Sequence, residues 1–303
     1  MKRIIIILIL VSAGFSSHSQ SRMFFSLSGG ILYYNGDLND KSIVPSTKIF
    51  RNYGNASIGA HITRHLNVQL NYYHGSVEGI DSLTKESDNK KRNLSFESRI
   101  DEISMLFSLS LFSNRTKRLA IPYVFAGGGI FFFNPKARYY GSNPDYYGQL
   151  IALQPLGTEG QYLTEGEHPE PYKLYQAVIP IGIGTYFRIN QKWRIKVEFA
   201  EHFTFTDYLD DASGKYPDMD ALAQTPKGEL AVYFSDRRKT KSPPNPKGYN
   251  RSNATRNDNY IHVGIGIVYN PQRQNPTRYR GPGAFKKMFS GRKGWWGNAG
   301  NGL

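Results

Sequence analysis

Apolar and polar residues alternate along the chain in about eight stretches. The clearest is 193–205, where Trp193, Ile195, Val197 and Phe199 share one face and polar or charged residues share the other. An alternation with a period of two is typical of a β-strand with one apolar and one polar face. The predicted strands are 23–34, 53–63, 66–76, 100–111, 121–133, 177–190, 193–205 and 260–269.

The connections between these strands alternate between short and long. Three are short turns, whereas the long ones cover 35–52, 77–99, 134–176 and 206–259. Outer-membrane barrels have short periplasmic turns and longer extracellular loops. The pattern therefore predicts an all-β fold: an eight-stranded antiparallel up-and-down transmembrane β-barrel of the outer-membrane type at residues 20–269, with four long extracellular loops. Pro and Gly predict that the last two loops are irregular rather than helical, with partial disorder from Asp236 to Arg256.

The first residues have the pattern of a secretory signal peptide, which we assign to residues 1–19. Lys2 and Arg3 precede an apolar run at 4–11, and Ser17 and Ser19 allow cleavage before Gln20. The run is far shorter than the ~20 residues that a membrane-spanning helix needs. The alternative is a short buried helix. With a signal peptide and eight strands, both termini are expected in the periplasm of a Gram-negative cell.

Composition narrows the class of protein further. The chain has no cysteine, which excludes disulfides, thiolate metal sites and a lipid anchor on cysteine. Aromatic residues make up 14% of the chain although its mean hydropathy is −0.49, which suits a barrel with an apolar outside and a polar lumen, or equally a soluble β-sandwich. The net charge of +14 indicates attraction to anionic outer-membrane lipid, because a secreted barrel rarely meets nucleic acid.

The polar face of 193–205 carries four residues that would point into the barrel. Eight strands leave an interior only wide enough for side chains, and buried charges are costly unless they are paired. We therefore expect these residues to pair with inward groups on neighbouring strands and to fill the lumen rather than to form a transport path. The predicted lumen charge network consists of Arg194, Lys196, Glu198 and His202.

Acidic residues cluster just beyond two strands that would end on the outer side. Asp37 follows the first strand, while Asp207, Asp210 and Asp211 follow the seventh. These strands are near neighbours in a closed barrel, so the four carboxylates could approach one another and bind calcium. The alternative, which we favour, is that they accept hydrogen bonds from nearby turn backbone. We accordingly predict no metal and no cofactor.

Residues 270–303 follow the last strand as a basic, aromatic tail that would lie in the periplasm. From residue 271 onward the tail contains seven Lys or Arg residues and no Asp or Glu. One interpretation is a disordered tail held near anionic lipid, and the other is a peptide that orders on a partner through aromatic anchors. The docking residues in the second case are Phe285, Lys286, Lys287, Phe289, Arg292, Lys293, Trp295 and Trp296.

Four segments carry a resemblance to a known family: Tyr-Tyr-Asn-Gly-Asp-Leu at 33–38, Ile-Pro-Tyr-Val-Phe-Ala-Gly at 121–127, Ala-Val-Ile-Pro-Ile-Gly at 177–182 and Phe-Thr-Phe-Thr-Asp-Tyr-Leu-Asp-Asp at 203–211. Over 23–269 they resemble the PorG-like outer-membrane β-barrel proteins of Bacteroidota. The resemblance implies a component of the type IX secretion system, which serves protein transport and gliding motility. It also implies as partners a periplasmic secretion-ring lipoprotein and its associate, PorK- and PorN-like. The long last two loops and the tail depart from the family pattern, so a paralogue with another partner is the alternative.

Three functions are compatible with these features. A non-enzymatic barrel that anchors the periplasmic ring is favoured by the resemblance and by the tail. A lipid-modifying enzyme would need an oriented nucleophile or base, but His74 and His202 show no such spacing, so we predict neither enzymatic activity nor a small-molecule substrate. A surface adhesion or binding barrel would act through its long outer loops. Its aromatic anchors would be Tyr139, Tyr140, Tyr146 and Tyr147.

Overall fold

The computed structural model describes residues 23–39, 46–84, 87–166 and 168–271. The predicted signal peptide and the docking residues of the tail lie outside the described residues. The strands are β1 (Met23–Asn35), β2 (Arg51–His61), β3 (Leu66–Ile80), β4 (Ser95–Ser110), β5 (Ala120–Arg138), β6 (Leu150–Ala152), β7 (Tyr175–Arg188), β8 (Trp193–Thr204) and β9 (Asn259–Tyr269). The helices are η1 (Thr47–Ile49), η2 (Asp81–Leu83), α2 (Ser87–Arg92), η3 (Gln154–Leu156), α3 (Met219–Ala223) and α4 (Gly228–Ser235).

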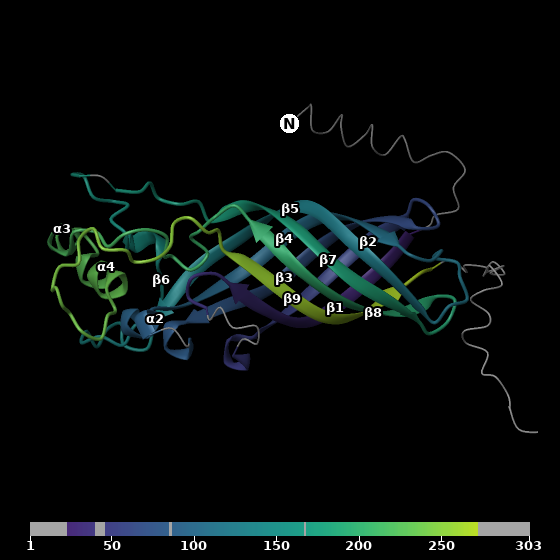
Figure 1. Ribbon diagram of the computed structural model, residues 1–303, viewed down its shortest axis with the longest axis horizontal. Helices are drawn as coiled ribbons and strands as arrows, with labels where there is room; N and C mark the ends of the chain where they lie inside the picture. Colours follow the sequence, from purple (N-terminus) through teal and green to yellow (C-terminus); the bar gives the residue numbers. More distant parts are fainter. Residues whose placement is uncertain (1–22, 40–45, 85–86, 167, 272–303) are drawn as a thin grey trace, which may run out of the picture.

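Eight of these strands close into one antiparallel barrel (Figure 1). The order around the barrel is β1, β2, β3, β4, β5, β7, β8 and β9, and β1 pairs with β9 to complete the cylinder. Along this closing pair, Phe25 lies opposite Tyr269 and Asn35 lies opposite Asn259. The short β6 pairs only with the far end of β5. The predicted fold class, an eight-stranded antiparallel β-barrel, is confirmed.

The barrel wall is apolar outside and largely polar inside. Along β8, Trp193, Val197 and Phe199 are 41%, 40% and 48% exposed, whereas the alternate residues Lys196 and Glu198 are buried. The same apolar exterior continues around the barrel on the other strands. Its members include Leu27, Ile58, Leu70, Ile103, Phe107, Val124, Ile183 and Ile265. A soluble sheet has the opposite arrangement, with its apolar face buried and its polar face in water.

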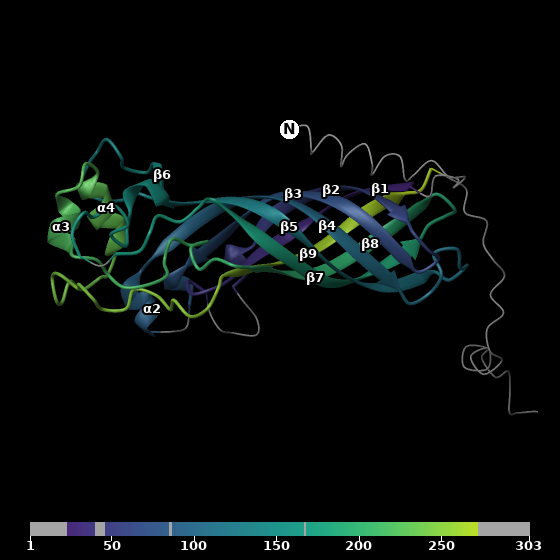
Figure 2. The ribbon, with the colours of Figure 1, turned by 90° about the horizontal axis from the view of Figure 1, so that it is seen from above.

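The two ends of the barrel differ, as the two perpendicular views show (Figures 1 and 2). One end, called the turn end, carries the connections 62–65, 111–119 and 189–192. The other, called the loop end, carries 36–50, 81–94, 139–174 and 205–258. The last two of these connections fold together beyond the strands, and we call them the cap (139–166, 168–174 and 205–258). The predicted separation of short and long connections is therefore present.

The cap is held on the loop end by an apolar core that continues into the barrel. Leu156, Leu209 and Phe234 of the cap belong to the same buried cluster as Phe133 and Tyr260 of the barrel wall. Because this core is continuous, the cap and the upper barrel are expected to behave as one packed body. None of the helices in the described ranges has the length and apolar character that a membrane crossing requires.

The prediction that the last two loops contain no helix is wrong. α3 begins after Asp218, whose carboxylate accepts hydrogen bonds from the backbone N–H groups of Asp220 and Ala221. α4 buries Leu230 and Phe234 in the core of the cap. In the basic segment that follows, Asp236 is 4% exposed and forms an ion pair with Arg238, whereas residues 239–244 and 247–250 are exposed. The Pro and Gly content of these loops did not reveal the apolar residues that α3 and α4 bury.

Three strands extend further than the alternation predicted. β3 and β4 stay paired as far as Ile80 opposite Ser95, and β5 pairs with β4 as far as Lys136 opposite Glu97. The predicted loop 77–99 is therefore only 81–94. The outward side chains here include Glu78, Glu97 and Lys136, so the strands lack the apolar outer face on which the prediction relied. Their inward side chains are nevertheless buried, because the cap covers them.

Two glycines allow β1 and β9 to pack closely beside an aromatic ring. Gly30 and Gly264 lie opposite each other in the pairing of the two strands. A Cβ on Gly30 would lie 2.1 Å from the Val263 carbonyl oxygen, and one on Gly264 would lie 1.9 Å from the Tyr53 hydroxyl. The absence of these side chains leaves the room that Tyr53 occupies in the lumen.

Candidate functional site

The lumen is filled by side chains, several of them charged. Lys196 Nζ lies 2.7 Å from Glu198 Oε2, and the two side chains are 2% and 3% exposed. The hydroxyl of Tyr123 on β5 donates a second hydrogen bond of 2.7 Å to Glu198. The Lys–Glu pair therefore lies within β8 itself, whereas sequence reasoning expected partners on neighbouring strands.

A second lumen network crosses the barrel at the level of His202. His202 Nδ1 lies 2.7 Å from Glu102 Oε2 on β4, and its Nε2 lies 2.8 Å from His262 Nδ1 on β9. Tyr260 donates a hydrogen bond of 2.6 Å to the same Glu102 oxygen. Because β4 and β8 are not adjacent, this contact spans the lumen and obstructs it. His202 has the partners of a structural histidine.

Arg194 lies near the turn end, apart from the other lumen charges. Its Nη2 donates a hydrogen bond of 2.6 Å to the carbonyl oxygen of Asn114 in the β4–β5 connection. Polar contacts among His61, Asn67 and Asn114 close the same end. The four predicted lumen residues thus all lie inside the barrel, but at three separate levels rather than in one network.

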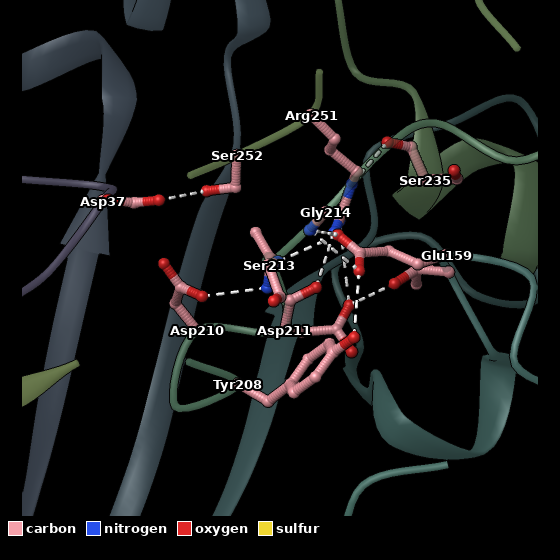
Figure 3. Close-up of polar contacts among 12 residues, drawn as sticks. Asp37, Glu159, Tyr208, Asp210, Asp211, Ser213, Gly214, Ser235, Arg251 and Ser252 are labelled. Atoms are coloured by element: carbon pink, nitrogen blue, oxygen red, sulfur yellow. Dashed lines mark hydrogen bonds and ion pairs between the residues drawn. The ribbon is translucent and has the colours of Figure 1, made fainter. Parts of the chain in front are cut away.

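The predicted acidic motif is divided among three places at the loop end of the barrel. Asp210 accepts a 2.5 Å hydrogen bond from the hydroxyl of Tyr34, which also donates to Asp258 over 2.7 Å. Asp207 is buried nearby, at 8% exposure. Asp37 lies apart and accepts hydrogen bonds from Ser252 Oγ (2.7 Å) and the backbone N–H of Asn253 (2.6 Å) (Figure 3).

Asp211 belongs to an ionic cluster that the sequence did not reveal (Figure 3). Its carboxylate accepts hydrogen bonds from Thr158 Oγ1 (2.5 Å) and the Tyr172 hydroxyl (2.6 Å). Arg251 Nη1 lies 3.0 Å from Glu159 Oε1, and Arg251 Nη2 lies 3.7 Å from Asp211 Oδ2. Glu159 also accepts from the backbone N–H of Ser213 at 2.9 Å. These contacts tie the two halves of the cap together.

Burial changes the acidity of several cap carboxyls. Burial raises the pKa of Asp207 to about 8 and that of Asp211 to about 6, although Arg251 opposes the second shift. Burial also raises the pKa of Asp210 and of Asp258, and each is raised further by neighbouring carboxylates. The Tyr34 hydroxyl partly offsets both shifts. The raised pKa of Asp207 favours its protonated form near neutral pH.

Within the described ranges, no group of three or more His, Asp or Glu side chains is arranged to hold a metal ion. Local turn chemistry accounts for one contact of the cluster: Asp210 accepts a hydrogen bond of 2.8 Å from the backbone N–H of Ala212. Its other main contact, and those of Asp211, reach across long sequence separations. The cluster therefore acts as a buried link between segments of the cap and the barrel.

The other candidate residues have separate surroundings. Of the four loop tyrosines, Tyr139 is 2% exposed, Tyr146 packs against the apolar core, and Tyr140 and Tyr147 are 56% and 64% exposed. His74 lies on the outer surface of β3, with Nδ1 2.8 Å from Asp101 Oδ1. No triad that joins His74 or His202 to Ser76 or Thr204 is present among the contacts of the described chain.

The chain resembles known outer-membrane proteins in its fold but not in its sequence. No family model matches the chain, and no curated protein matches its sequence. The structure is similar to Neisserial surface protein A, with 7% identity, a TM-score of 0.39 and coverage of 84% of this chain and 99% of that one. It is similar to Ail, the attachment invasion locus protein of Yersinia pestis, with 8% identity, a TM-score of 0.37 and coverage of 83% of this chain and 99% of that one. It is also similar to a major outer membrane protein from Thermus thermophilus, with 11% identity, a TM-score of 0.40 and the same two coverages. Because these TM-scores are all below 0.5, the barrel fold is assigned from the strand pairing of this chain itself.

Proposed function

We propose that this protein is an integral outer-membrane barrel that serves as a rigid, non-conducting scaffold and not as an enzyme. The observation that carries the proposal is the continuous apolar exterior of a closed barrel whose interior is filled. Only helices and closed barrels satisfy their backbone polar groups in hydrocarbon. The contact between His202 and Glu102 and the Lys196–Glu198 pair occupy the lumen, which argues against a transport pore.

The orientation can be tested directly because the chain has no natural cysteine. We expect the cap to face outward, with both termini in the periplasm. A single cysteine at Lys239→Cys in the cap should react with a membrane-impermeant maleimide on intact cells. The matched variant Arg64→Cys, at an exposed position of the turn end, should react only after the outer membrane is permeabilised. The reverse labelling pattern would exclude the proposed orientation.

We propose further that the scaffold is a component of the type IX secretion and gliding machinery, with a periplasmic ring lipoprotein and its partner bound to the tail. The support is the resemblance to PorG-like proteins and the basic aromatic sequence of the tail. The test is affinity purification of the full chain and of a chain that lacks residues 271–303. A tail with Trp295 and Trp296 replaced by alanine keeps the charge and controls for electrostatic binding alone. Equal recovery of the ring proteins with all three chains would exclude tail docking.

A second candidate function is adhesion or binding through the cap. The observation in its favour is that the long loops are not loose chains but a packed unit that presents Tyr140 and Tyr147 to solvent. Ordered aromatic side chains bind with a small loss of conformational entropy. Replacement of both tyrosines by serine should reduce adhesion and leave protein secretion intact. Loss of secretion with normal adhesion would favour the first function instead.

A further inference from the structure

A cavity of about 540 Å³ lies at the loop end, beside the acidic clusters described above. Its walls come from three connections: the start of the β1–β2 connection, α2, and the 205–258 part of the cap. Cavities of roughly 300–1,000 Å³ are the usual size of small-molecule sites. None of the functions considered so far uses this space.

The floor of the cavity is fixed by Arg92, whose side chain is 11% exposed. Arg92 donates to both carboxylate oxygens of Asp81, over 2.9 and 2.8 Å, and to the Arg251 carbonyl oxygen over 2.8 Å. Asp37 is fixed from the opposite side by Ser252 and Asn253 (Figure 3). These contacts hold three distant segments of the chain together before any ligand arrives, so a ligand would meet a preorganised surface.

Cations at the rim remain available to a ligand. Arg256 is exposed and donates to the amide oxygen of Asn35 over 3.1 Å, and it forms no ion pair within the described part of the chain. Among the residues that the structure describes, Lys91 pairs only with Asp88, and their side chains are 77% and 89% exposed. Such an exposed pair is weak and exchanges readily with other partners. The rim therefore offers two cations to a negatively charged group.

Acceptors and an aromatic ring complete the lining. The carboxylates of Asp37 and Asp88 would repel a simple anion but would accept hydrogen bonds from hydroxyl groups. Tyr249 is 62% exposed at the edge of the cavity. Its carbonyl oxygen accepts the backbone N–H of Tyr216 at 2.9 Å, which fixes the strand segment that carries it. A flat apolar ring beside polar groups suits a ligand with one apolar face.

We propose that this cavity binds an anionic saccharide of about two rings, with a carboxylate or phosphate on Arg256 and Lys91, hydroxyl groups on Asp37, and one ring face against Tyr249. The combination of cations, acceptors and an exposed ring matches a ligand that carries both negative charge and hydroxyl donors. The same chemistry is offered by a free saccharide and by one linked to a surface lipid. The inference goes beyond the proposed scaffold function and requires only that the cap is folded.

The test is calorimetric titration of the purified full chain in detergent micelles with digalacturonate, an anionic disaccharide. Cellobiose serves as the uncharged disaccharide of similar size, and hexaglutamate as an acidic peptide. The proposal predicts binding of digalacturonate and at least about tenfold weaker binding of cellobiose. Absence of digalacturonate binding, equal binding of cellobiose, or tighter binding of hexaglutamate would each overturn it.

A pair of matched variants assigns the binding to this cavity. Arg256→Ala should weaken digalacturonate binding about tenfold. Arg138→Ala removes another exposed arginine that also donates to one neutral oxygen, the Gly148 carbonyl. Because Arg138 lies outside the cavity, this variant should bind digalacturonate as tightly as the wild type. Tyr249→Ala should also weaken binding, and each variant is first checked for folded migration on unheated gels. Equal affinities for all variants would place the binding elsewhere and overturn the proposal.

If binding is found, a competition experiment distinguishes a free saccharide from one that is linked to a surface lipid. Competition between digalacturonate and vesicles that contain lipopolysaccharide should abolish the calorimetric signal when the natural ligand is linked to lipid. Vesicles of uncharged phospholipid are the control and should leave the signal intact. Failure of tail docking or of surface labelling would leave these results unaffected, because the titration needs neither.

Discussion

The lumen and the cap both bury charged residues, but they do so in different ways. In the lumen, Lys196, Glu198 and His202 lie on one regular strand, and each projects inward because of the strand alternation. In the cap, Arg251, Glu159 and Asp211 come from loops that are far apart in sequence. A barrel wall thus places charge by periodicity, whereas the cap places it by tertiary packing. We therefore expect the stability of the cap to depend more on each single ionic contact than the stability of the barrel does.

The largest expected effect is the loss of Arg251. Its guanidinium pairs with Glu159 and Asp211 and donates to the Ser235 and Asp211 carbonyl oxygens. Removal of one partner of a buried ion pair costs about 3–5 kcal/mol, and two carboxylates lose their partner here. Arg251→Met should therefore expose the cap to rapid trypsin cleavage while the barrel fragment persists. The exposed Arg256→Met is the control, and equal cleavage rates would contradict the central role of Arg251.

The loss of Lys196 should have a somewhat smaller effect, and in the barrel instead of the cap. Lys196→Met leaves Glu198 buried without its cation, although the Tyr123 hydroxyl still donates to it. We expect a loss near the lower end of the range of about 3–5 kcal/mol. Urea unfolding in phospholipid vesicles measures this change. The double variant Lys196→Met with Glu198→Gln should recover much of the loss, and no recovery would mean that packing rather than charge is at fault.

A third difference is the response of the cap to pH. Burial raises the pKa of Asp207 to about 8 and that of Asp211 to about 6 in the folded cap. A carboxyl whose folded pKa is raised stabilises the fold fully below its unfolded pKa, and the contribution is lost as pH rises through the folded value. The cap should therefore become easier to cleave by protease between about pH 4 and pH 8. Asp207→Asn should make this profile flatter and slow cleavage at high pH.

Asp218 provides the control for that experiment because its shift has the opposite sign. Hydrogen bonds from Lys247 and Asn245 lower the pKa of Asp218 to about 2. Its stabilising contribution is present above its unfolded pKa and lost as pH falls. Asp218→Asn should leave the profile above pH 5 unchanged in shape. A wild-type cap with equal protease resistance at pH 4 and pH 8 would contradict the assignment of protonated carboxyls.

The smallest effect is expected at the rim of the cavity. Lys91→Ala removes an ion pair whose members are 77% and 89% exposed. Exposed pairs contribute about 0.2–1 kcal/mol, and those on helices about 0.3–0.5 kcal/mol. The stability of the cap should change within that range, as measured by protease resistance at neutral pH. A much larger loss would mean that Lys91 supports the cap structurally and is not available to a ligand.

The barrel could be predicted because its information is local. The alternation over 193–205 placed Trp193 and Phe199 on the outside and Lys196 and Glu198 inside, as the structure has them. The loop and turn ends followed from the lengths of the connections. The prediction missed the outer parts of β3, β4 and β5. Outward side chains such as Glu78 and Lys136 are polar there, so apolar and polar residues no longer alternate along the strands.

The cap could not be predicted in the same way because its contacts are not local. The hydrogen bond from Tyr34 to Asp258 joins a residue on β1 to a residue just before β9. No sequence pattern in either segment indicates that the two residues are in contact. Asp210 and Asp211 were found as a motif, but the partners of Asp211, which are Thr158, Tyr172 and Arg251, were not. The type IX role, the partners, the signal peptide and the docking tail stay predictions.

The closing pair of β1 and β9 has a consequence for biogenesis. The first and last strands complete the cylinder, so β1 and β8 each keep an open edge until residues 259–269 have been synthesised. Open edges are excluded from hydrocarbon and recruit other chains by strand addition. For the proposed outer-membrane barrel, insertion must therefore follow release of nearly the whole polypeptide. A product truncated within the cap would be expected to aggregate unless a chaperone held it. The strand β9 therefore has a second role, because its synthesis decides when the cylinder can close.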